Sequence, residues 1–165
     1  MGQHTNIEWC DSTINPTSGC DGCELFQAGK QATATCYASH LHTRRLARSF
    51  PDKYAADFSE VRMLAGRMEQ AANWPDLRGK ERPDKPWLNG RPRHIFVGDL
   101  GDFLSRGVPD DYIIREIIGN IVSPAGRRHF WLLLTKRPRR LAEISRRLPH
   151  GLPPNCMAID RKSVV

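Results

Sequence analysis

One stretch decides the expected fold: His94-Ile95-Phe96-Val97-Gly98-Asp99-Leu100-Gly101-Asp102. Its apolar beginning is typical of a strand that is buried on both faces of a parallel sheet. A second apolar run, Phe130-Trp131-Leu132-Leu133-Leu134, leads directly into Thr135-Lys136-Arg137. Between the two runs, Pro109-Asp110-Asp111 indicates the first turn of a helix, because proline and acidic residues both suit that position. The sequence therefore predicts a strand–helix–strand unit with parallel strands.

The same alternation extends toward the N-terminus. Residues 6–9 alternate between apolar and polar side chains, and we expect a short first strand there. Good helix formers run from Cys36 to about Ser49, and in this helix His42 is expected to be exposed to solvent. Residues 58–63 then predict a short strand that runs into a helix ending near Trp74.

The segment between Trp74 and the central strand is polar and rich in proline, so residues 75–93 are expected to form a long loop. Within it, Trp87 and Leu88 are expected to pack on the core. Toward the C-terminus, Pro138 opens another helix with an apolar side. Strands and helices thus alternate along the chain.

This alternation predicts an α/β fold, either an open parallel sheet with flanking helices or a partial (β/α) barrel. A full eight-fold barrel takes roughly 250 residues, and the chain has 165. We expect a single domain over residues 1–165. A further strand begins near Asn155, but the polar tail 160–165 interrupts it, so we expect the domain to be incomplete at its C-terminus.

Length and composition limit the class of protein. No apolar run approaches the roughly 18 residues that a membrane-spanning helix needs. The N-terminus lacks the basic and then apolar segments of a signal peptide. Both absences predict a cytoplasmic protein with no membrane-spanning segment. The five cysteines should then be reduced, and close cysteines in that compartment suit metal binding or catalysis better than disulfides.

The net charge of +7 is concentrated in one segment. Residues 126–150 hold eight basic residues and one acidic residue, while the rest of the chain is neutral overall. Arginine favours planar contacts with phosphate or carboxylate groups. The exposed candidates for contact with a nucleic acid are Arg139, Arg140, Arg146 and Arg147. The alternative is a helix face that is simply solvated.

The chemistry of the chain is concentrated in its cysteines. Cys20-Asp21-Gly22-Cys23 lies in a turn-rich loop, and Cys36 follows thirteen residues later. Three thiolates suit a [4Fe–4S] cluster with one open iron, or zinc with a fourth ligand such as His40. The alternative is a set of unrelated thiols. Cys10 and Cys156 stand apart, and we interpret both as ordinary small apolar residues.

Polar residues also follow the two central strands. The carboxyl ends of parallel strands form the working face of such sheets, so these residues and the cysteines are expected to converge. Asp99 and Asp102 could bind a ribose, an amine or a metal, and Gly98 permits close approach of a ligand. Lys136 or Arg137 could hold a carboxylate or phosphate. The alternatives are loop hydrogen bonding for the two acids and a solvated basic turn for the two cations.

Several motifs together resemble one family. They are Ile7-Glu8-Trp9, Asn15-Pro16-Thr17-x-Gly19-Cys20-Asp21-Gly22-Cys23, Cys36-Tyr37-Ala38, Lys85-Pro86-Trp87-Leu88, Ile95-Phe96-Val97-Gly98-Asp99-x-Gly101-Asp102 and Leu134-Thr135-Lys136-Arg137-Pro138. The set resembles the phage-associated three-cysteine-motif proteins, a family of unknown function. That family is similar to radical S-adenosylmethionine (SAM) enzymes, with spore photoproduct lyase among the nearest. The resemblance covers the chain up to about Ala158.

The resemblance implies a partial (β/α) barrel in which Cys20, Cys23 and Cys36 are the cluster ligands. It also implies that SAM binds the fourth iron and is cleaved reductively to an adenosyl radical. By analogy, the loop from Asp99 to Asp102 could help to hold SAM. The spacing is Cys-x₂-Cys-x₁₂-Cys, whereas radical-SAM enzymes usually carry Cys-x₃-Cys-x₂-Cys.

The sequence leaves three hypotheses open. The first is a [4Fe–4S], radical-SAM-like enzyme of phage or prophage type that acts on nucleic acid. The second is a zinc-stabilised module that binds nucleic acid or a protein partner without catalysis. The third is a truncated remnant without activity. Iron–sulfur clusters and zinc both accept thiolate ligands, so metal content separates the first two hypotheses.

Overall fold

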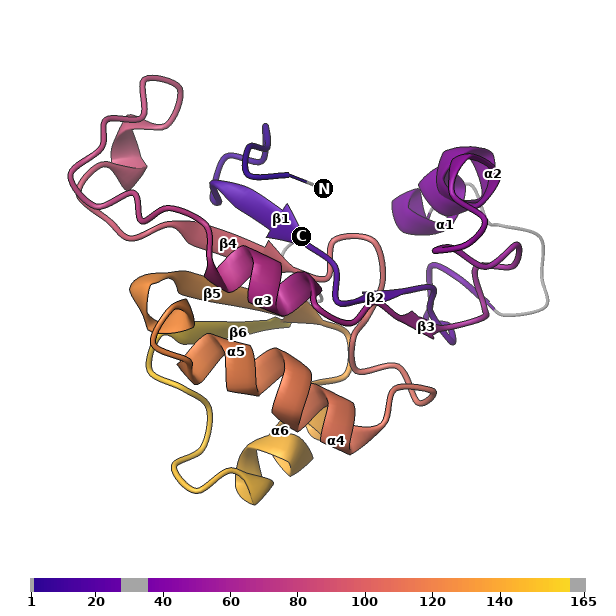
Figure 1. Cartoon of the computed structure of the whole chain (residues 1–165). Coiled ribbons are helices and arrows are strands. Elements are labelled where there is room, and N and C mark those ends of the chain that lie inside the picture. Colours follow the sequence, from indigo (N-terminus) through magenta and orange to yellow (C-terminus); the bar gives the residue numbers. More distant parts are fainter. Residues whose placement is uncertain (1, 28–35, 161–165) are drawn as a thin grey trace.

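The computed structural model describes residues 2–27 and 36–160 and has an α/β fold (Figure 1). Four parallel strands form one open sheet in the order β1-β4-β5-β6. Their bounds are Ser12–Ile14 (β1), His94–Val97 (β4), Phe130–Thr135 (β5) and Cys156–Asp160 (β6). The register aligns Ile14 with Val97, Val97 with Leu133, and Leu133 with Ala158. The predicted α/β class and parallel strand direction are therefore confirmed.

Helices pack on one face of this sheet (Figure 1). They are α3 (Arg67–Ala72), α6 (Pro138–Arg147) and a continuous helix made of α4 (Asp110–Tyr112), the π-helical turn Ile113–Ile118 and α5 (Gly119–Val122). Apolar side chains of the strands meet apolar side chains of these helices in the main core. Its members include Ile95, Val97, Trp131, Leu133, Met68, Ile113, Ile117, Ile121, Leu141 and Ile144. The helices expected at Pro109 and Pro138 are thus present, and both bury an apolar side.

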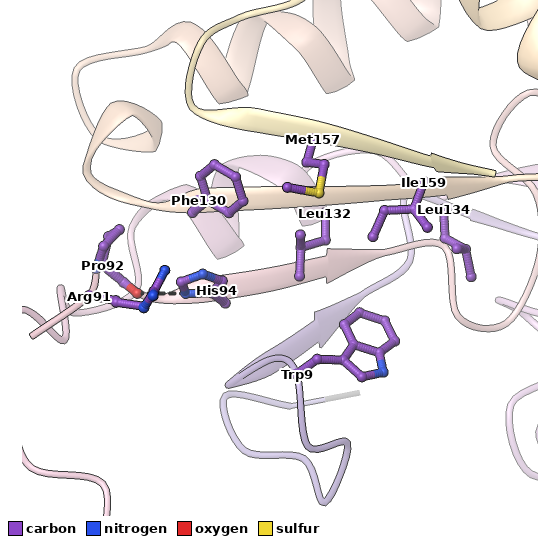
Figure 2. Close-up of a pocket in the computed structure, with 9 residues that line it drawn as sticks. All are labelled: Trp9, Arg91, Pro92, His94, Phe130, Leu132, Leu134, Met157 and Ile159. Atoms are coloured by element: carbon purple, nitrogen blue, oxygen red, sulfur yellow. Dashed lines mark hydrogen bonds between the residues drawn. The ribbon is translucent and has the colours of Figure 1, made fainter. Parts of the chain in front are cut away.

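The opposite face of the sheet is also apolar, but it is only partly covered. Alternate strand residues, among them Phe96 and Leu132, point to this side, where Cys10 also packs. A cavity lies over this face, and Figure 2 shows the side chains that line it. Two of them, Trp9 and Met157, remain 41% and 50% exposed. We expected the strands to be buried on both faces, whereas α3, α5 and α6 all contribute to the core of the first face.

The first strand does not lie where the sequence pattern predicts it. Residues 6–9 form turns, and β1 begins at Ser12. The ammonium group of Lys85 explains the difference. It donates hydrogen bonds to the carbonyl oxygens of Thr5, Ile7 and Cys10 at 2.6, 2.7 and 2.5 Å. The segment therefore wraps around a cation, and its carbonyl groups are not available for a strand ladder.

The helix expected over residues 36–49 is present as α1 (Tyr37–Leu41), the π-helical turn His42–Leu46 and α2 (Ala47–Ser49). The prediction that His42 is exposed is wrong, because its side chain is 1% exposed. Its Nε2 lies 2.7 Å from the carbonyl oxygen of Ala55, and its ring meets the ring of Phe58 edge-on. A backbone acceptor and an aromatic neighbour thus make burial of this imidazole favourable.

The middle of the chain matches its prediction in outline. β3 (Arg62–Met63) pairs antiparallel with β2 (Thr17–Ser18), and α3 follows it. Residues 75–93 form a loop with one 3₁₀ turn, Pro86–Leu88, and a second such turn, Gly126–Arg128, precedes β5.

Within that loop Leu88 is buried as predicted, but Trp87 is 54% exposed because its indole nitrogen donates to the Glu8 carbonyl at the surface. The tail 161–165 lies outside the described residues. None of the helices described here has the length and apolar character to cross a membrane.

Candidate functional site

Three loops meet at the carboxyl edge of the sheet. The cysteine loop follows β1 and β2, a second loop follows β4, and a third follows β5. One pocket lies between them, and residues from all three loops line it together with the start of α1. The lining includes six residues singled out from the sequence: Cys20, Cys23, Cys36, Gly98, Asp102 and Lys136. The structure therefore brings together most of the predicted site, although these residues are spread over 117 positions of the chain.

Two glycines allow the cysteine loop to lie against the loop after β4. Gly19 and Gly101 form a parallel β-bridge. A Cβ atom on Gly101 would lie 2.7 Å from the carbonyl oxygen of Gly19, too close for any side chain. Gly19 itself has a φ of +82°, which L-residues rarely adopt. The contact between the two loops therefore requires glycine on both sides.

Each cysteine is held by its local backbone. The Cys20 amide donates to the Phe58 carbonyl at 2.8 Å, and the Cys23 amide donates to the Phe26 carbonyl at 2.6 Å. Cys36 is the N-cap of α1, where its Sγ accepts a hydrogen bond from the Ser39 amide at 3.4 Å. All five cysteines of the chain are free thiols. The pocket thus has three thiols on ordered backbone and no disulfide that would occupy them.

The walls between the thiols are apolar. Phe26 and Phe58 meet edge-on with ring centroids 4.9 Å apart, and both line the pocket with Ala38 and Leu134. Cys20 and Cys36 are each only 8% exposed. Sequence spacing gave no sign of these two aromatic residues, because a contact between residues 26 and 58 depends on the loop geometry. Burial among apolar groups is one of the features that tune iron–sulfur centres.

In the described residues the three thiols are not arranged as the ligands of a single metal ion. Within residues 2–27 and 36–160, no group of three or more His, Cys, Asp or Glu side chains is placed to hold a metal ion. A [4Fe–4S] cluster takes cysteine thiolates as ligands, and metal content decides between a cluster and a single ion. His40, the predicted fourth zinc ligand, is half-buried on α1 and is not among the residues that line the pocket.

Protonation of the thiols follows from their surroundings. Burial raises the pKa of the Cys20 thiol, while a backbone hydrogen bond at Gly22 and the positive charge of Arg137 oppose this rise. The thiol therefore keeps its proton at neutral pH until a metal displaces it. Metal binding at this pocket should release protons and should weaken at low pH.

Asp102 has a structural task in this pocket. Its carboxylate accepts hydrogen bonds at 3.0 Å from the Thr135 hydroxyl and from the amides of Leu104 and Lys136. It also forms an ion pair with Arg137 at 3.0 Å. The acceptor capacity of this side chain is thus used by the protein, and Asp102 joins the loop after β4 to the loop after β5.

Asp99 lies on the other side of the same loop. Its carboxylate accepts a hydrogen bond from the Asn15 side chain, and the oxygen of that amide accepts one from the Leu100 backbone. Burial raises the pKa of Asp99, with the Asn15 hydrogen bond opposing the rise. Asp99 does not line the cysteine pocket. The two acids that the sequence grouped therefore have different surroundings.

The two cations after β5 both contact the cysteine loop. Lys136 Nζ lies 2.6 Å from Glu24 Oε1. Arg137 pairs with Asp21 and donates to the Gly22 carbonyl at 2.9 Å. Since Arg137 also pairs with Asp102, it links all three loops. The sequence placed it at the same rim but gave no indication of this bridging contact.

The predicted arginine patch on α6 is only partly available for a partner. Arg140 donates to the carbonyl groups of Leu104 at 2.9 Å and Val108 at 2.5 Å and pairs with Asp110 at 2.7 Å. Arg147 also pairs with Asp110, at 2.5 Å. Arg139 and Arg146 are exposed. Two of the four guanidinium groups thus pair with the first residue of α4, and Arg140 also binds the loop before it.

The apolar cavity on the open sheet face continues toward the cysteine pocket. Leu134 lines both spaces, and Leu132, Ile159 and Trp9 extend the apolar surface away from it (Figure 2). Arg91 and His94 line the end of the cavity that lies away from Leu134, next to the amino end of β4. A ligand at the thiols would therefore have an apolar surface beside it.

Comparison with known proteins gives one family. A family model described as Protein of unknown function (DUF5131) matches residues 4–159. No curated protein and no solved structure gives a significant match to the chain.

Proposed function

We propose that this chain, which belongs to the family Protein of unknown function (DUF5131), is a radical-SAM-like enzyme that binds a [4Fe–4S] cluster through Cys20, Cys23 and Cys36. The proposal rests on one observation: all three thiols line the same pocket at the carboxyl edge of a parallel sheet. Ligands of parallel α/β sheets bind at that edge. Three thiolates would leave one iron without a protein ligand.

The chain's own residues would have distinct tasks. The three thiols bind the cluster, and the rings of Phe26 and Phe58 limit access of water to it. When bound, the cluster would supply one electron for the cleavage of SAM. The cysteine loop is held against the strand ends by the Gly19–Gly101 bridge and by Arg137, which fixes the position of the thiols.

Four residues after the two central strands were predicted to bind a cofactor, and the geometry supports two of them for direct contact with SAM. Gly98 has a φ of +90° and presents backbone without a side chain to the pocket. Lys136 lines the pocket, and its ammonium group pairs with Glu24. Asp102 would act by positioning the two loops, since the protein uses its acceptors. Asp99 would stabilise the loop after β4 through its hydrogen bond with Asn15, outside the pocket.

SAM cleavage tests this proposal directly. Anaerobically reconstituted protein is incubated with SAM and a strong reductant, and methionine and 5′-deoxyadenosine are measured by chromatography. We expect both products from wild type and from Cys156→Ser, whose cysteine lies outside the pocket, and neither product from Cys23→Ala. Wild-type protein that carries its cluster but leaves SAM intact would overturn the assignment to radical-SAM chemistry.

A further inference from the structure

The helix that begins after Cys36 has a strongly basic outer face. Ala38, Ser39 and His42 are buried and define its inner side. Three arginines, Arg44, Arg45 and Arg48, are exposed, and the helix contains no acidic residue. The same helix supplies Cys36 and Ala38 to the cysteine pocket. This basic face thus lies on the element that carries one of the proposed cluster ligands.

These three arginines differ from those of α6 in what they contact. Among the described residues, none of the three forms an ion pair or a side-chain hydrogen bond. On α6, by contrast, Arg140 and Arg147 are both paired with Asp110. Figure 1 shows α1 and α2 to one side of the sheet, apart from the helices that cover it. Within the part of the chain that the structure describes, no acidic side chain pairs with the arginines of this face.

Exposed aromatic side chains lie at both ends of the same helix. Tyr37 in its first turn is 66% exposed, and Phe50 just after its last residue is 51% exposed. Free arginines alone describe an ordinary solvated face. Arginines interleaved with exposed aromatic rings match the chemistry of single-stranded nucleic acid, whose phosphates pair with cations and whose bases stack on rings.

We propose that the outer face of this helix, made of Tyr37, Arg44, Arg45, Arg48 and Phe50, binds single-stranded nucleic acid. The arginines contact phosphates and Tyr37 stacks on a base. Since Tyr37 directly follows Cys36, the bound strand passes beside the cysteine pocket. This inference names the substrate class of the proposed enzyme and rests on that proposal for its catalytic meaning. It also moves the phosphate contacts from α6 to this helix.

Fluorescence anisotropy with labelled strands tests the surface. Single-stranded DNA, single-stranded RNA of the same sequence and duplex DNA are titrated at several salt concentrations. For the triple variant Arg44→Gln, Arg45→Gln and Arg48→Gln we expect the slope of log K against log salt to fall in magnitude by about 2. Affinity near 0.1 M salt should then fall by about 100-fold. Tyr37→Ala should lower affinity by about tenfold without changing the slope.

The double variant Arg139→Gln and Arg146→Gln is the matched control, because it removes two exposed arginines from α6. It should retain wild-type affinity and slope. Circular dichroism should show the same helix content in all variants. The two single-stranded arms decide between DNA and RNA, and both should bind more tightly than duplex.

Several outcomes would overturn the inference. They are absence of binding by the wild type, equal losses in the triple and control variants, or tight binding of polyglutamate in place of nucleic acid, which would indicate an acidic protein partner. A Cys36→Ser variant separates this inference from the proposed function. If it lacks iron but binds the strand, the surface stands without the cluster. If wild type carries its cluster and binds no strand, the surface fails alone.

Discussion

The two edges of the parallel sheet both hold their loops through cations, but only one of them carries a pocket lined by thiols. At the amino edge, Lys85 donates to three backbone carbonyl groups, and Arg82 pairs with Asp11 at 2.7 Å and donates to three further carbonyl groups. At the carboxyl edge, three thiols line a pocket and none is bonded to another. At the amino edge Lys85, Arg82 and Asp11 are therefore used for structure. At the carboxyl edge the thiols are unbonded, and the proposed function assigns a ligand to them, as is usual at this edge of parallel sheets.

The largest effect on stability is expected when a cation is removed from the amino edge. Arg82 and Asp11 have side chains that are 8% and 6% exposed. Arg82→Met would leave the Asp11 carboxylate buried without its partner. We expect the free energy of unfolding, measured with urea, to fall by about 3–5 kcal/mol.

A surface pair provides the control for this change. Arg78 pairs with Asp76 at 2.7 Å, but the Arg78 side chain is 56% exposed. Arg78→Met should change the free energy of unfolding by less than about 1 kcal/mol. Equal losses in the two variants would contradict a structural role specific to the amino edge.

The next largest effect is expected at the contact between the carboxyl-edge loops. A methyl group at Gly101 would lie 2.7 Å from the Gly19 carbonyl oxygen, so Gly101→Ala should cost about 1–3 kcal/mol of stability and displace the cysteine loop. Urea denaturation and bound iron measure the two consequences. At Gly107 the nearest atom, Val61 Cβ, is 3.7 Å away, and Gly107→Ala should leave iron binding unchanged. Full iron content in Gly101→Ala would show that the loop contact does not position the thiols.

A smaller effect on stability is expected from His42, whose ring packs against Phe58 in the wall of the pocket. Burial lowers the pKa of His42 from 6.5, with the hydrogen bond to the Ala55 carbonyl opposing the shift. The unfolded chain then binds a proton that the folded chain does not, so stability present above pH 6.5 is lost as the pH falls below it. We therefore expect the folded chain to be less stable at pH 5.5 than at pH 7.5 because of this group. His42→Gln should show a smaller difference between urea denaturation at the two pH values, and an unchanged difference would contradict this origin.

Much of the fold could be predicted from local patterns. The apolar runs of β4 and β5 and the prolines at 109 and 138 define elements by themselves. The convergence of the cysteine loop, Gly98 and Lys136 followed from the rule that parallel strands end at one edge. These features depend on neighbours in sequence or on a general property of the topology.

The failed predictions depend on contacts between distant residues. Residues 6–9 alternate like a strand, but Lys85 takes their carbonyl groups. His42 resembles a surface residue of a basic helix until Ala55 and Phe58 surround it. Asp99 and Asp102 lie in the same short loop, and the sequence does not distinguish their roles. Their roles differ because Asp99 contacts Asn15 and Asp102 contacts Thr135. A single sequence does not encode such partners in any local spacing.

Metal content is the most direct test of the proposal that Cys20, Cys23 and Cys36 bind a [4Fe–4S] cluster. Iron and acid-labile sulfide are measured, with the visible spectrum, on protein purified without oxygen for wild type, Cys36→Ser and Cys156→Ser. Serine at position 36 can still cap α1, so loss of metal would not reflect loss of the helix. If the chain binds one [4Fe–4S] cluster, we expect about four iron and four sulfide per chain in wild type and Cys156→Ser, and none in Cys36→Ser. One zinc without visible absorption, or equal metal in all three proteins, would contradict it.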